Sequence, residues 1–415
     1  MTASESDELP VRYADIERAR ERLDDESVVK ETPVERSTSL EGLVGGEVYL
    51  KMEHLQWTGS FKTRGAYNKI RQDVADGVEE FVAASAGNHA QGVALAATEC
   101  GADATIFMPR TAPQAKVDAT RGYGATVELV GKDFQETMAH AQSAAEDGDA
   151  AFVHAYDDPD IIAGQGTLGT EMYHHCPGVD TVIVPIGGGG LISGIATAIK
   201  HLSPETRVVG VQATGAETVH QSLDKGIPVT LDQVDTIADG IATGGISELT
   251  LSIIEHHVDR VVTVSDTEIA RAILLLMERA KQVVEGAGAA SVAALLSGDL
   301  DVTDETVMPL LCGGNLDMTQ LRTVLIHALT DRQQLLRLRI RIDDRPGVME
   351  EISGIIADFG ANIHDVRHDR SVDDLDVGEA YLVFNVETGG SEHAAAIVEA
   401  IEDAEYAVEN IAKTI

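Results

Sequence analysis

The amino-acid sequence predicts an α/β fold with parallel strands, followed by a smaller domain of ferredoxin-like order. Short apolar, β-branched segments alternate with helix-like segments between about residues 46 and 316, and this alternation is typical of parallel sheets. After residue 330 the pattern changes to a βαββαβ order. The chain has 415 residues and is 44% hydrophobic, which is enough for two or three domains with real cores.

The strands expected in the first part are short and apolar. They are VYLKM, FVAAS, ATIFMP, TVELV, TVIVPI, VVGVQ and VMPLLC. Strands buried on both faces of a parallel sheet need not alternate in polarity. The helices between them carry end signals: Gly101 follows HAQGVALAATEC as a C-terminal cap, and Ser265 with Glu268 forms a capping box before DTEIARAILLLMERA.

One uncharged run, Thr181–Ile199, has the length of a membrane span. Pro185 and four consecutive glycines interrupt it, so a strand, a loop and a helix explain it better than a bilayer-crossing helix.

The C-terminal part begins after a polar segment, TDRQQ, at Thr330–Gln334. The strictly alternating LLRLRIRI predicts a half-exposed strand. It is followed by DDRPG, then VMEEISGIIADFG, ANIHDVRHDR and EAYLVFNVET, and then by another helix and a last strand. We therefore expect one domain over residues 1–330 and a second over residues 333–415.

Charge and cysteine content limit the classes of partner. The formal net charge is -38, with acids spread along the chain, which favours a protein that works in high salt, where screening suppresses self-repulsion. Nucleic acid and anionic membranes are poor partners for such a surface. Three cysteines without CxxC spacing and a polar, acidic N-terminus predict a reduced, cytoplasmic protein without a signal peptide.

A lysine stands inside a glycine-bracketed segment, GSFKTRGA at Gly59–Ala66. A lysine that must react as an uncharged nucleophile needs a shaped pocket, whereas a solvated lysine does not need this approach. The octapeptide alone leaves both interpretations of Lys62 equally open.

The segment SAGNH, Ser85–His89, follows an apolar run and precedes a helix. The free N–H groups of a helix N-terminus bind a carboxylate or a phosphate, and Gly87 would let a ligand approach the backbone. Ser85 and Asn88 could instead be ordinary helix caps.

Four glycines, Gly187–Gly190, and then Leu191 lie between the strand TVIVPI and the helix LISGIATAI. A tight turn needs one or two glycines, and four cost backbone entropy. Amides that converge on an anion, most simply a phosphate, explain the run better. Neither GxxxxGK[ST] nor GxGxxG occurs at this turn.

The last segment is CGGN, Cys312–Asn315, at the end of the strand VMPLLC. A small polar side chain there points into the crevice where α/β sheets bind ligands, although taken alone it is more often a buried core cysteine. Together the segments provide a phosphate cradle, a lysine, a second anion site and a small polar group. A phosphorylated aldehyde held by a lysine uses all four, and that cofactor is pyridoxal phosphate.

In this order and spacing, KMEHLQWTGSFKTRGA, SAGNHAQG, GGGGL and CGGN resemble the threonine dehydratases (threonine ammonia-lyases), which are fold-type II pyridoxal phosphate enzymes. The resemblance covers roughly residues 15–330. The tail, with DRPGVMEEISGIIADFGANI, resembles an ACT regulatory domain. The resemblance implies two α/β lobes with the cofactor between them, the smaller lobe (about residues 55–150) being an insertion in the larger.

The resemblance also implies residue roles. Lys62 would carry the cofactor and, once the substrate frees it, remove the substrate Cα proton. Phe61 would lie beside the pyridine ring, and Asn88 would hydrogen-bond the ring hydroxyl oxygen. The phosphate would be held by Gly187, Gly188, Gly189, Gly190 and Leu191. The substrate carboxylate would be held by Ser85, Gly87 and His89.

Cys312 stands where the family usually has a serine facing the pyridine nitrogen. A thiol is the weaker hydrogen-bond partner. Neither group is a carboxylate, so neither strongly protonates the ring, and this suits elimination over transamination.

The implied reaction is the elimination of water from L-threonine, which gives 2-oxobutanoate and ammonia, with L-serine giving pyruvate in the same way. Isoleucine, whose biosynthesis begins with this reaction, would be the effector at the ACT domain, with valine as an opposing ligand. A homo-oligomer, a dimer or a tetramer, is expected. In another interpretation, the ACT unit serves oligomerisation alone.

Serine racemase and a β-replacement enzyme such as cysteine synthase are the alternative activities of this fold. Serine racemases have a second segment that resembles SSGNH, and its second serine delivers a proton to the opposite face of the substrate. In this chain the same position is Ala86, which has no proton to transfer. Gln212 and Thr218 stand where metal-binding racemases have acids, so no metal is expected. A catalytically dead binding protein would lack Lys62, which is present.

Overall fold

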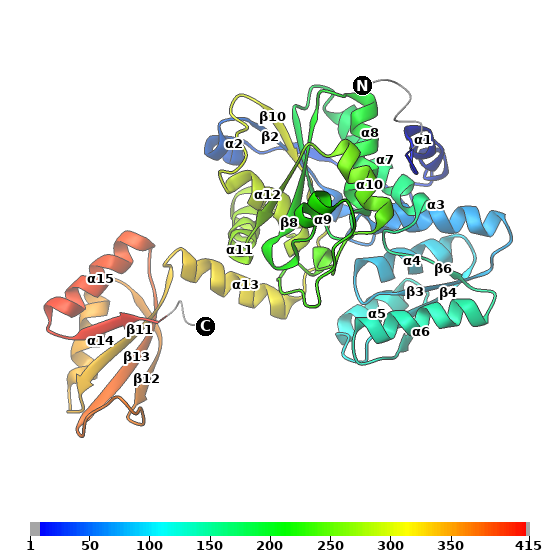
Figure 1. The fold of residues 1–415 in the computed structure, drawn as a ribbon. Helices are drawn as coiled ribbons and strands as arrows, with labels where there is room; N and C mark the ends of the chain where they lie inside the picture. Colours follow the sequence, from blue (N-terminus) through cyan, green and yellow to red (C-terminus); the bar gives the residue numbers. More distant parts are fainter. Residues whose placement is uncertain (1–8, 412–415) are drawn as a thin grey trace. The chain divides into compact units, whose positions relative to one another are not determined.

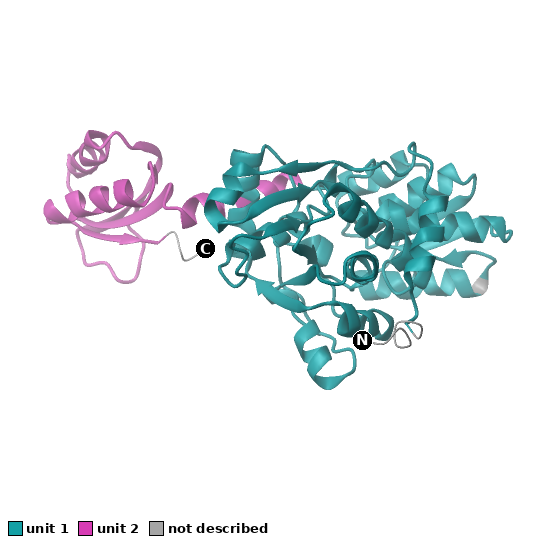
Figure 2. Cartoon of the chain, turned by 90° about the horizontal axis from the view of Figure 1, so that it is seen from above, with its two compact units in different colours: residues 1–316 teal, residues 317–415 magenta. Residues whose placement is uncertain are grey.

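The computed structural model describes residues 9–411, apart from the side chain of Asp147. Its contacts divide the chain into two compact units, residues 1–316 and 317–415 (Figure 2). The division falls before helix α13 (Met318–Asp331), whereas the sequence suggested a boundary after that helix. The expected absence of a signal peptide concerns residues outside the described part.

The first unit contains two sheets. The larger has the strand order β1-β2-β10-β7-β8-β9, and only the edge pair β1–β2 is antiparallel. The smaller has the order β5-β4-β3-β6 and is parallel throughout. The larger sheet consists of β1 (Val34–Arg36), β2 (Glu47–Lys51), β7 (Thr181–Pro185), β8 (Arg207–Ala213), β9 (Arg260–Val264) and β10 (Thr306–Pro309). The smaller consists of β3 (Glu80–Ala84), β4 (Asp103–Met108), β5 (Thr126–Leu129) and β6 (Ala151–Phe152).

Helices cover both faces of each sheet. Figure 1 shows α11 and α12 on one side of the larger sheet and α8 and α10 on the other. The helices are α1 (Tyr13–Arg22), α2 (Thr38–Val44), α3 (Lys62–Ala75), α4 (Asn88–Glu99), α5 (Gln114–Gly122), α6 (Phe134–Asp147), α7 (Pro159–His175), α8 (Gly190–Leu202), α9 (Val219–Lys225), α10 (Glu248–His257), α11 (Asp266–Leu275) and α12 (Gly286–Leu296). Short helical turns are η1 (Glu53–Leu55), η2 (Thr214–Ala216), η3 (Asp239–Ile241) and the π-helical η4 (Leu276–Ala280).

Strand β3 shows why the parallel strands lack a polar face. Phe81 and Ala83 lie in the core beneath α3 and α4, while Val82 and Ala84 lie in a separate cluster with Ala141 of α6. Both faces are therefore buried, as expected for a parallel strand between two helical layers.

Helices α3 and α7 cross closely at two glycines. A Cβ on Gly65 would lie 2.4 Å from Gln165 Nε2, and a Cβ on Gly164 would lie 2.6 Å from the Arg64 carbonyl oxygen. Any larger side chain would push the helices apart, so this crossing fixes the position of the first turn of α3, where Lys62 lies.

The second unit begins with α13 and has an antiparallel sheet in the order β12-β13-β11-β14. Its elements are β11 (Leu335–Asp343), α14 (Val348–Asp358), β12 (Asn362–Asp369), β13 (Glu379–Glu387), α15 (Ser391–Asp403) and β14 (Ala407–Asn410). Every second residue of β11 from Leu336 to Ile342 is buried in the core. The predicted βαββαβ order and the alternating strand are confirmed.

The predicted strands and caps of the first part are also confirmed. Ser265 caps α11 in a capping box with Glu268, and Gly101 has the left-handed φ of 72° just beyond α4. The uncharged run forms β7, a glycine loop and α8, and no described helix is long and apolar enough to cross a membrane. Strands β1, β6 and β9 were not predicted.

Candidate active site

Lys62 begins helix α3 and is half-buried. Its Nζ donates a hydrogen bond to the carbonyl oxygen of Ala155, 2.9 Å away. Burial disfavours the charged amine and lowers the pKa of Lys62 to about 8, although the nearby Cys312 and Glu285 act in the opposite direction. With this pKa, about a tenth of the amine is uncharged at pH 7, and the uncharged form is the one that reacts as a nucleophile.

Backbone contacts bring the Lys62 segment to the end of β10. Ser60 and Gly313 form an isolated bridge, and the Phe61 N–H donates to the Cys312 carbonyl oxygen at 3.3 Å. The Phe61 ring centroid lies 5.1 Å from Lys62 Nζ. GSFK and CGGN, which are about 250 residues apart in sequence, thus form one site.

Cys312 is buried at this site. Burial, reinforced by the negative charge of Glu285, raises the pKa of its thiol well above the usual value. Cys312 therefore presents a neutral S–H rather than a thiolate.

The SAGNH segment lies between β3 and α4, and Asn88 is the first residue of α4. The first N–H groups of a helix have no acceptor within the helix. Ser85 Oγ accepts the Gly87 N–H at 3.2 Å, which shapes this turn. The helix N-terminus can thus receive an anion.

The ring of His89 is not directed to a carboxylate. Its Nε2 lies 2.9 Å from the carbonyl oxygen of Val153, so Nε2 carries the proton and donates it. Burial, together with the nearby charge of Lys62, lowers the pKa of His89 to about 3, and the ring is neutral. Any contribution of His89 to anion binding must come from its backbone N–H.

The glycine run leaves no room for side chains. A Cβ on Gly188 would lie 2.2 Å from the ring of Tyr156, and one on Gly189, whose φ is +92°, would lie 2.8 Å from Thr250 Cβ. Thr250 Oγ1 also donates to the Gly188 carbonyl oxygen at 2.9 Å. Helix α8 begins at Gly190, so the loop leads into a second helix N-terminus that can bind an anion, and Leu191 lies in its first turn.

These residues fit pyridoxal phosphate. A lysine amine with a lowered pKa suits an aldehyde, and the glycine loop before α8 suits a phosphate. Asn88 supplies an amide, and Cys312 a neutral thiol, for the polar atoms of a pyridine ring.

Two polar residues beside Asn88 were not predicted from the sequence to belong to the site. Asn88 Nδ2 donates to Glu285 Oε1 at 2.7 Å, and Asn315 Nδ2 donates to Asn88 Oδ1 at 2.8 Å. Glu285 lies 197 residues from Asn88 and belongs to no motif, so only the fold reveals it. Asn315 is the last residue of the CGGN segment, and its place in that segment was the only sequence signal that could have indicated a role in the site.

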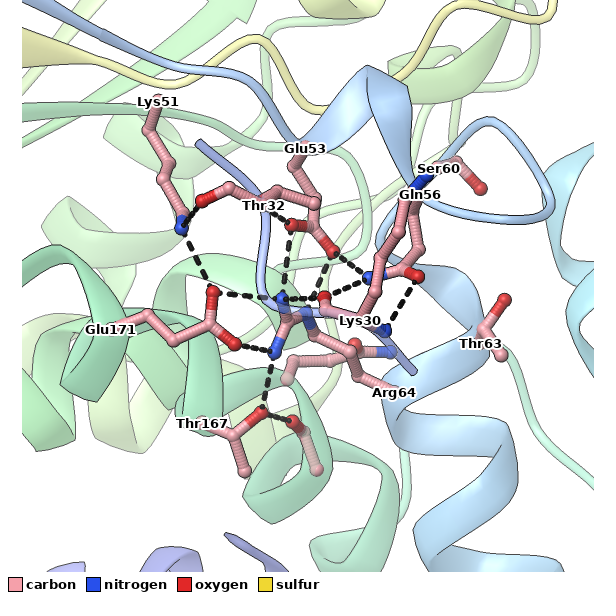
Figure 3. A network of polar contacts seen from close by, with 12 residues as sticks. Lys30, Thr32, Lys51, Glu53, Gln56, Ser60, Thr63, Arg64, Thr167 and Glu171 are labelled. Atoms are coloured by element: carbon pink, nitrogen blue, oxygen red, sulfur yellow. Dashed lines mark hydrogen bonds and ion pairs between the residues drawn. The ribbon is translucent and has the colours of Figure 1, made fainter. Parts of the chain in front are cut away.

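Helix α3, which begins at Lys62, is anchored by a buried ionic network around Arg64 in its first turn (Figure 3). Arg64 is 1% exposed and forms paired hydrogen bonds with both Glu53 and Glu171. Lys51 Nζ joins the network at 2.8 Å from Glu171. Because the two acids outweigh the effect of burial, the pKa of Arg64 is raised and its charge is permanent.

The described residues contain no group of three or more His, Cys, Asp or Glu side chains arranged to hold a metal ion. His154 and Asp157, which lie close together in sequence, are bonded to each other through the backbone: His154 Nδ1 accepts the Asp157 N–H at 2.8 Å. The amide of Gln212 is hydrogen-bonded to the backbone that follows it. Its Nε2 donates to the Ala216 carbonyl oxygen at 3.1 Å, and its Oε1 accepts the Val219 N–H at 2.9 Å.

Comparison with known proteins agrees with this geometry. Residues 26–313 match the pyridoxal-phosphate dependent enzyme family, and residues 336–405 match the ACT domain. An L-threonine ammonia-lyase of Thermotoga maritima is 44% identical over 93% of this chain and 96% of its own length. A second L-threonine ammonia-lyase, from Geobacter sulfurreducens, is 42% identical over 96% of this chain and 98% of its own.

Solved structures show the same similarity. The processed form of threonine deaminase isoform 2 from Solanum lycopersicum has a TM-score of 0.74 at 35% identity and covers 79% of this chain and 94% of its own. Maize serine racemase has a TM-score of 0.72 at 34% identity, with coverages of 78% and 99%. A lysine amine, a glycine loop and an Asn88 amide gathered at the ends of parallel strands are what this family needs for its cofactor, and the chain belongs to the pyridoxal-phosphate dependent enzymes of fold-type II, with an ACT domain at its C-terminal end.

Proposed function

We propose that this chain is an L-threonine ammonia-lyase that converts L-threonine to 2-oxobutanoate and ammonia. The observation that carries the proposal is the half-buried Lys62 amine, with its lowered pKa, in a chain that matches L-threonine ammonia-lyases over 93% and 96% of its length. L-Serine is proposed as a second substrate that gives pyruvate.

Lys62 is the residue proposed to hold the cofactor and to move the proton. Pyridoxal phosphate, when bound, supplies an electron sink for the negative charge that develops at the substrate Cα. Lys62 Nζ, once released, accepts the Cα proton, because a lysine with a pKa of about 8 is a competent base near neutral pH. In the structure, the free Lys62 amine donates a hydrogen bond to the Ala155 carbonyl oxygen at 2.9 Å.

The start of α4 is the proposed site for the substrate carboxylate. Ser85, Gly87 and the backbone N–H of His89 lie at this helix N-terminus, whose partial positive charge favours an anion. The neutral His89 ring lies below it against Val153 and supports the turn.

The proposed cofactor contacts are those of the sequence-based assignment. Phe61 lies beside Lys62. The amide of Asn88 would hydrogen-bond the ring oxygen, and the thiol of Cys312, which keeps its proton, would face the ring nitrogen. The phosphate is assigned to Gly187, Gly188, Gly189, Gly190 and Leu191.

A spectroscopic assay on the purified chain in high salt tests the proposal. The chain should show the absorbance band of a lysine-bound cofactor and produce 2-oxobutanoate from L-threonine. Lys62→Ala should lose both, whereas Lys69→Ala, on the same helix but paired with Asp73, should keep both. A band without ketoacid would refute the proposed reaction while keeping the cofactor.

Serine racemisation is the second candidate, because maize serine racemase shares the fold at 34% identity. Ala86 speaks against it, since a methyl group between Ser85 and Gly87 cannot deliver a proton to the opposite face of the substrate. D-Serine formed from L-serine at a rate comparable to pyruvate would favour the racemase.

Regulation is proposed to act through the ACT domain, with isoleucine as the effector and valine as an opposing ligand. The matched ACT domain over residues 336–405 supports a small-molecule effector. Threonine kinetics of the full chain that are identical with and without each amino acid would remove this part. We further propose a homo-oligomer, a dimer or a tetramer, working in high salt.

A further inference from the structure

Glu285 is a buried carboxylate that the reaction proposed above does not use. It lies directly before helix α12 and is 9% exposed. Among the described residues no cation lies within ion-pair distance of it, and its short polar contact is with the neutral amide of Asn88. An acid buried without an ion pair is costly to the fold, so its position calls for a functional explanation.

Two glycines make the space that this carboxylate occupies. A Cβ on Gly313 would lie 2.3 Å from Glu285 Oε1, and a Cβ on Gly240 would lie 3.0 Å from the same atom. The first glycine of CGGN is therefore required by Glu285. The carboxylate meets Asn88 from the opposite side of the site, since Asn88 belongs to the element after β3 in the smaller sheet.

The amide of Asn88 is held at both of its polar atoms. Asn315 Nδ2 donates to Asn88 Oδ1 at 2.8 Å and is itself anchored to the Thr58 carbonyl oxygen at 2.6 Å. Glu285 accepts from Asn88 Nδ2 at 2.7 Å. An ionised carboxylate can only accept hydrogen bonds, so the Asn88 amide cannot turn over without setting two oxygens against each other.

We propose that Glu285 is a positioning residue for the cofactor: by accepting from Asn88 Nδ2, its carboxylate keeps the second N–H of that nitrogen, rather than an oxygen, available to the ring oxygen of pyridoxal phosphate. The inference rests on the assignment of Asn88 to the cofactor and not on threonine as the substrate. A glutamine at 285 would accept or donate, and the Asn88 amide would then lose its fixed orientation.

The charge of Glu285 is sensitive to its surroundings. Burial raises the pKa of Glu285 to about 7, whereas the hydrogen bond from Asn88 and the charges of Lys116 and Lys62 lower it and Asp239 raises it. These groups act on the charge of the carboxylate from α4, α5, α3 and η3, so a change in any of them would shift its pKa.

The test uses the full-length, cofactor-loaded chain and reads the cofactor directly. Glu285→Gln should shift the absorbance band or its pH midpoint and weaken cofactor retention on dialysis roughly tenfold, the effect of losing one hydrogen bond to a charged group. Turnover should fall more than the KM changes. Glu136→Gln, which alters an exposed carboxylate on α6, should leave the band as it is.

A double-mutant cycle separates positioning from a structural role. If Glu285 acts through Asn88, Glu285→Gln should cause no further spectral change in an Asn88→Ala background. Additive changes would overturn the proposal, as would a variant that lowers the thermal midpoint while its band stays native. Should Glu285→Gln fail to fold, Asn315→Ala removes the hydrogen bond to the other polar atom of the Asn88 amide, Oδ1. An unchanged absorbance band in that variant would overturn the proposal equally.

Discussion

Replacing Arg64 by methionine removes the guanidinium at the centre of the network in Figure 3 while keeping an unbranched apolar stem. Arg64 Nε and Nη2 donate to Glu53 at 2.6 and 3.1 Å, and Nη1 and Nη2 donate to Glu171 at 2.6 and 3.0 Å. The substitution therefore breaks two bidentate ion pairs in one step.

The substitution affects Glu53 and Glu171 unequally, and this difference sets the expected loss in the free energy of unfolding. Glu171 keeps Lys51, 2.8 Å away. Glu53 is fully buried and keeps only the neutral donors Thr32 Oγ1 at 2.6 Å and Gln56 Nε2 at 3.4 Å. Leaving one buried charge without its partner costs about 3–5 kcal/mol, and we expect Arg64→Met to lower the free energy of unfolding by that amount.

Urea unfolding in high salt, followed by tryptophan fluorescence, measures this change. Trp57, the one tryptophan in the chain, lies beside the network: its Nε1 donates to the Glu26 carbonyl oxygen at 2.8 Å, and Lys30 Nζ lies 4.2 Å from its ring centroid. Arg36→Met is the matched control, because Arg36 binds Glu41 at an exposed position and its loss should shift the midpoint much less.

The double variant Arg64→Met/Glu53→Gln distinguishes charge from packing. Removing the stranded charge should recover part of the stability lost in Arg64→Met, so the double variant should be more stable than additivity allows. The reasoning is refuted if Arg64→Met unfolds at the same urea concentration as Arg36→Met, or if the double variant shows simple additivity.

Three further outcomes follow from the structure. A metal chelator should leave activity unchanged, because the Gln212 amide already bridges the loop to the Ala216 carbonyl oxygen; Gln212→Glu should lower the thermal midpoint, and added Mg²⁺ should restore part of it. The pKa of His89 is about 3 in the folded chain against 6.5 ordinarily, so the unfolded state binds more protons between these values, and the free energy of unfolding should fall as the pH decreases from 6.5 towards 3; a urea series at several pH values checks this, and His89→Asn should flatten the slope. Activity should rise with salt, because the net charge of -38 needs screening; highest activity in dilute buffer would contradict the high-salt hypothesis.

The features that the sequence could predict are those with local causes. Apolar β-branched runs made β7 and β8 recognisable, and the Ser265 capping box located the start of α11. Strands β1 and β6 have only three and two residues, too few for a pattern to emerge. Strand β9 contains the apolar, β-branched run VVTV, which is a local cause of the same kind as in β7 and β8, so this strand was within reach of the sequence.

The site was predictable where a motif carries its own chemistry, and not where contacts cross the fold. Lys62 and Cys312 lie in such motifs, and backbone bonds bring their segments together. Nothing local distinguishes Glu285 from the many surface acids of this chain, and its role depends on Asn88, 197 residues away. For the same reason, the sequence could not show that the His89 ring turns to Val153.

The glycine run has two causes, and this limits what it proves. The sequence favours a phosphate cradle because four glycines exceed the needs of a turn. In the structure, Tyr156 fills the space beside Gly188, and Thr250 fills the space beside Gly189. Packing alone would therefore exclude side chains at both positions whichever ligand the loop binds, and loss of activity on Gly188→Ala would not establish a phosphate contact.

The amine of Lys62 and the amide of Asn88 are more informative, because packing gives no reason for a lysine of lowered pKa at the start of α3 or for a buried acid that fixes one asparagine. Substitutions at these two positions, read through the absorbance of the cofactor, therefore test the site more directly than any change in the glycine loop.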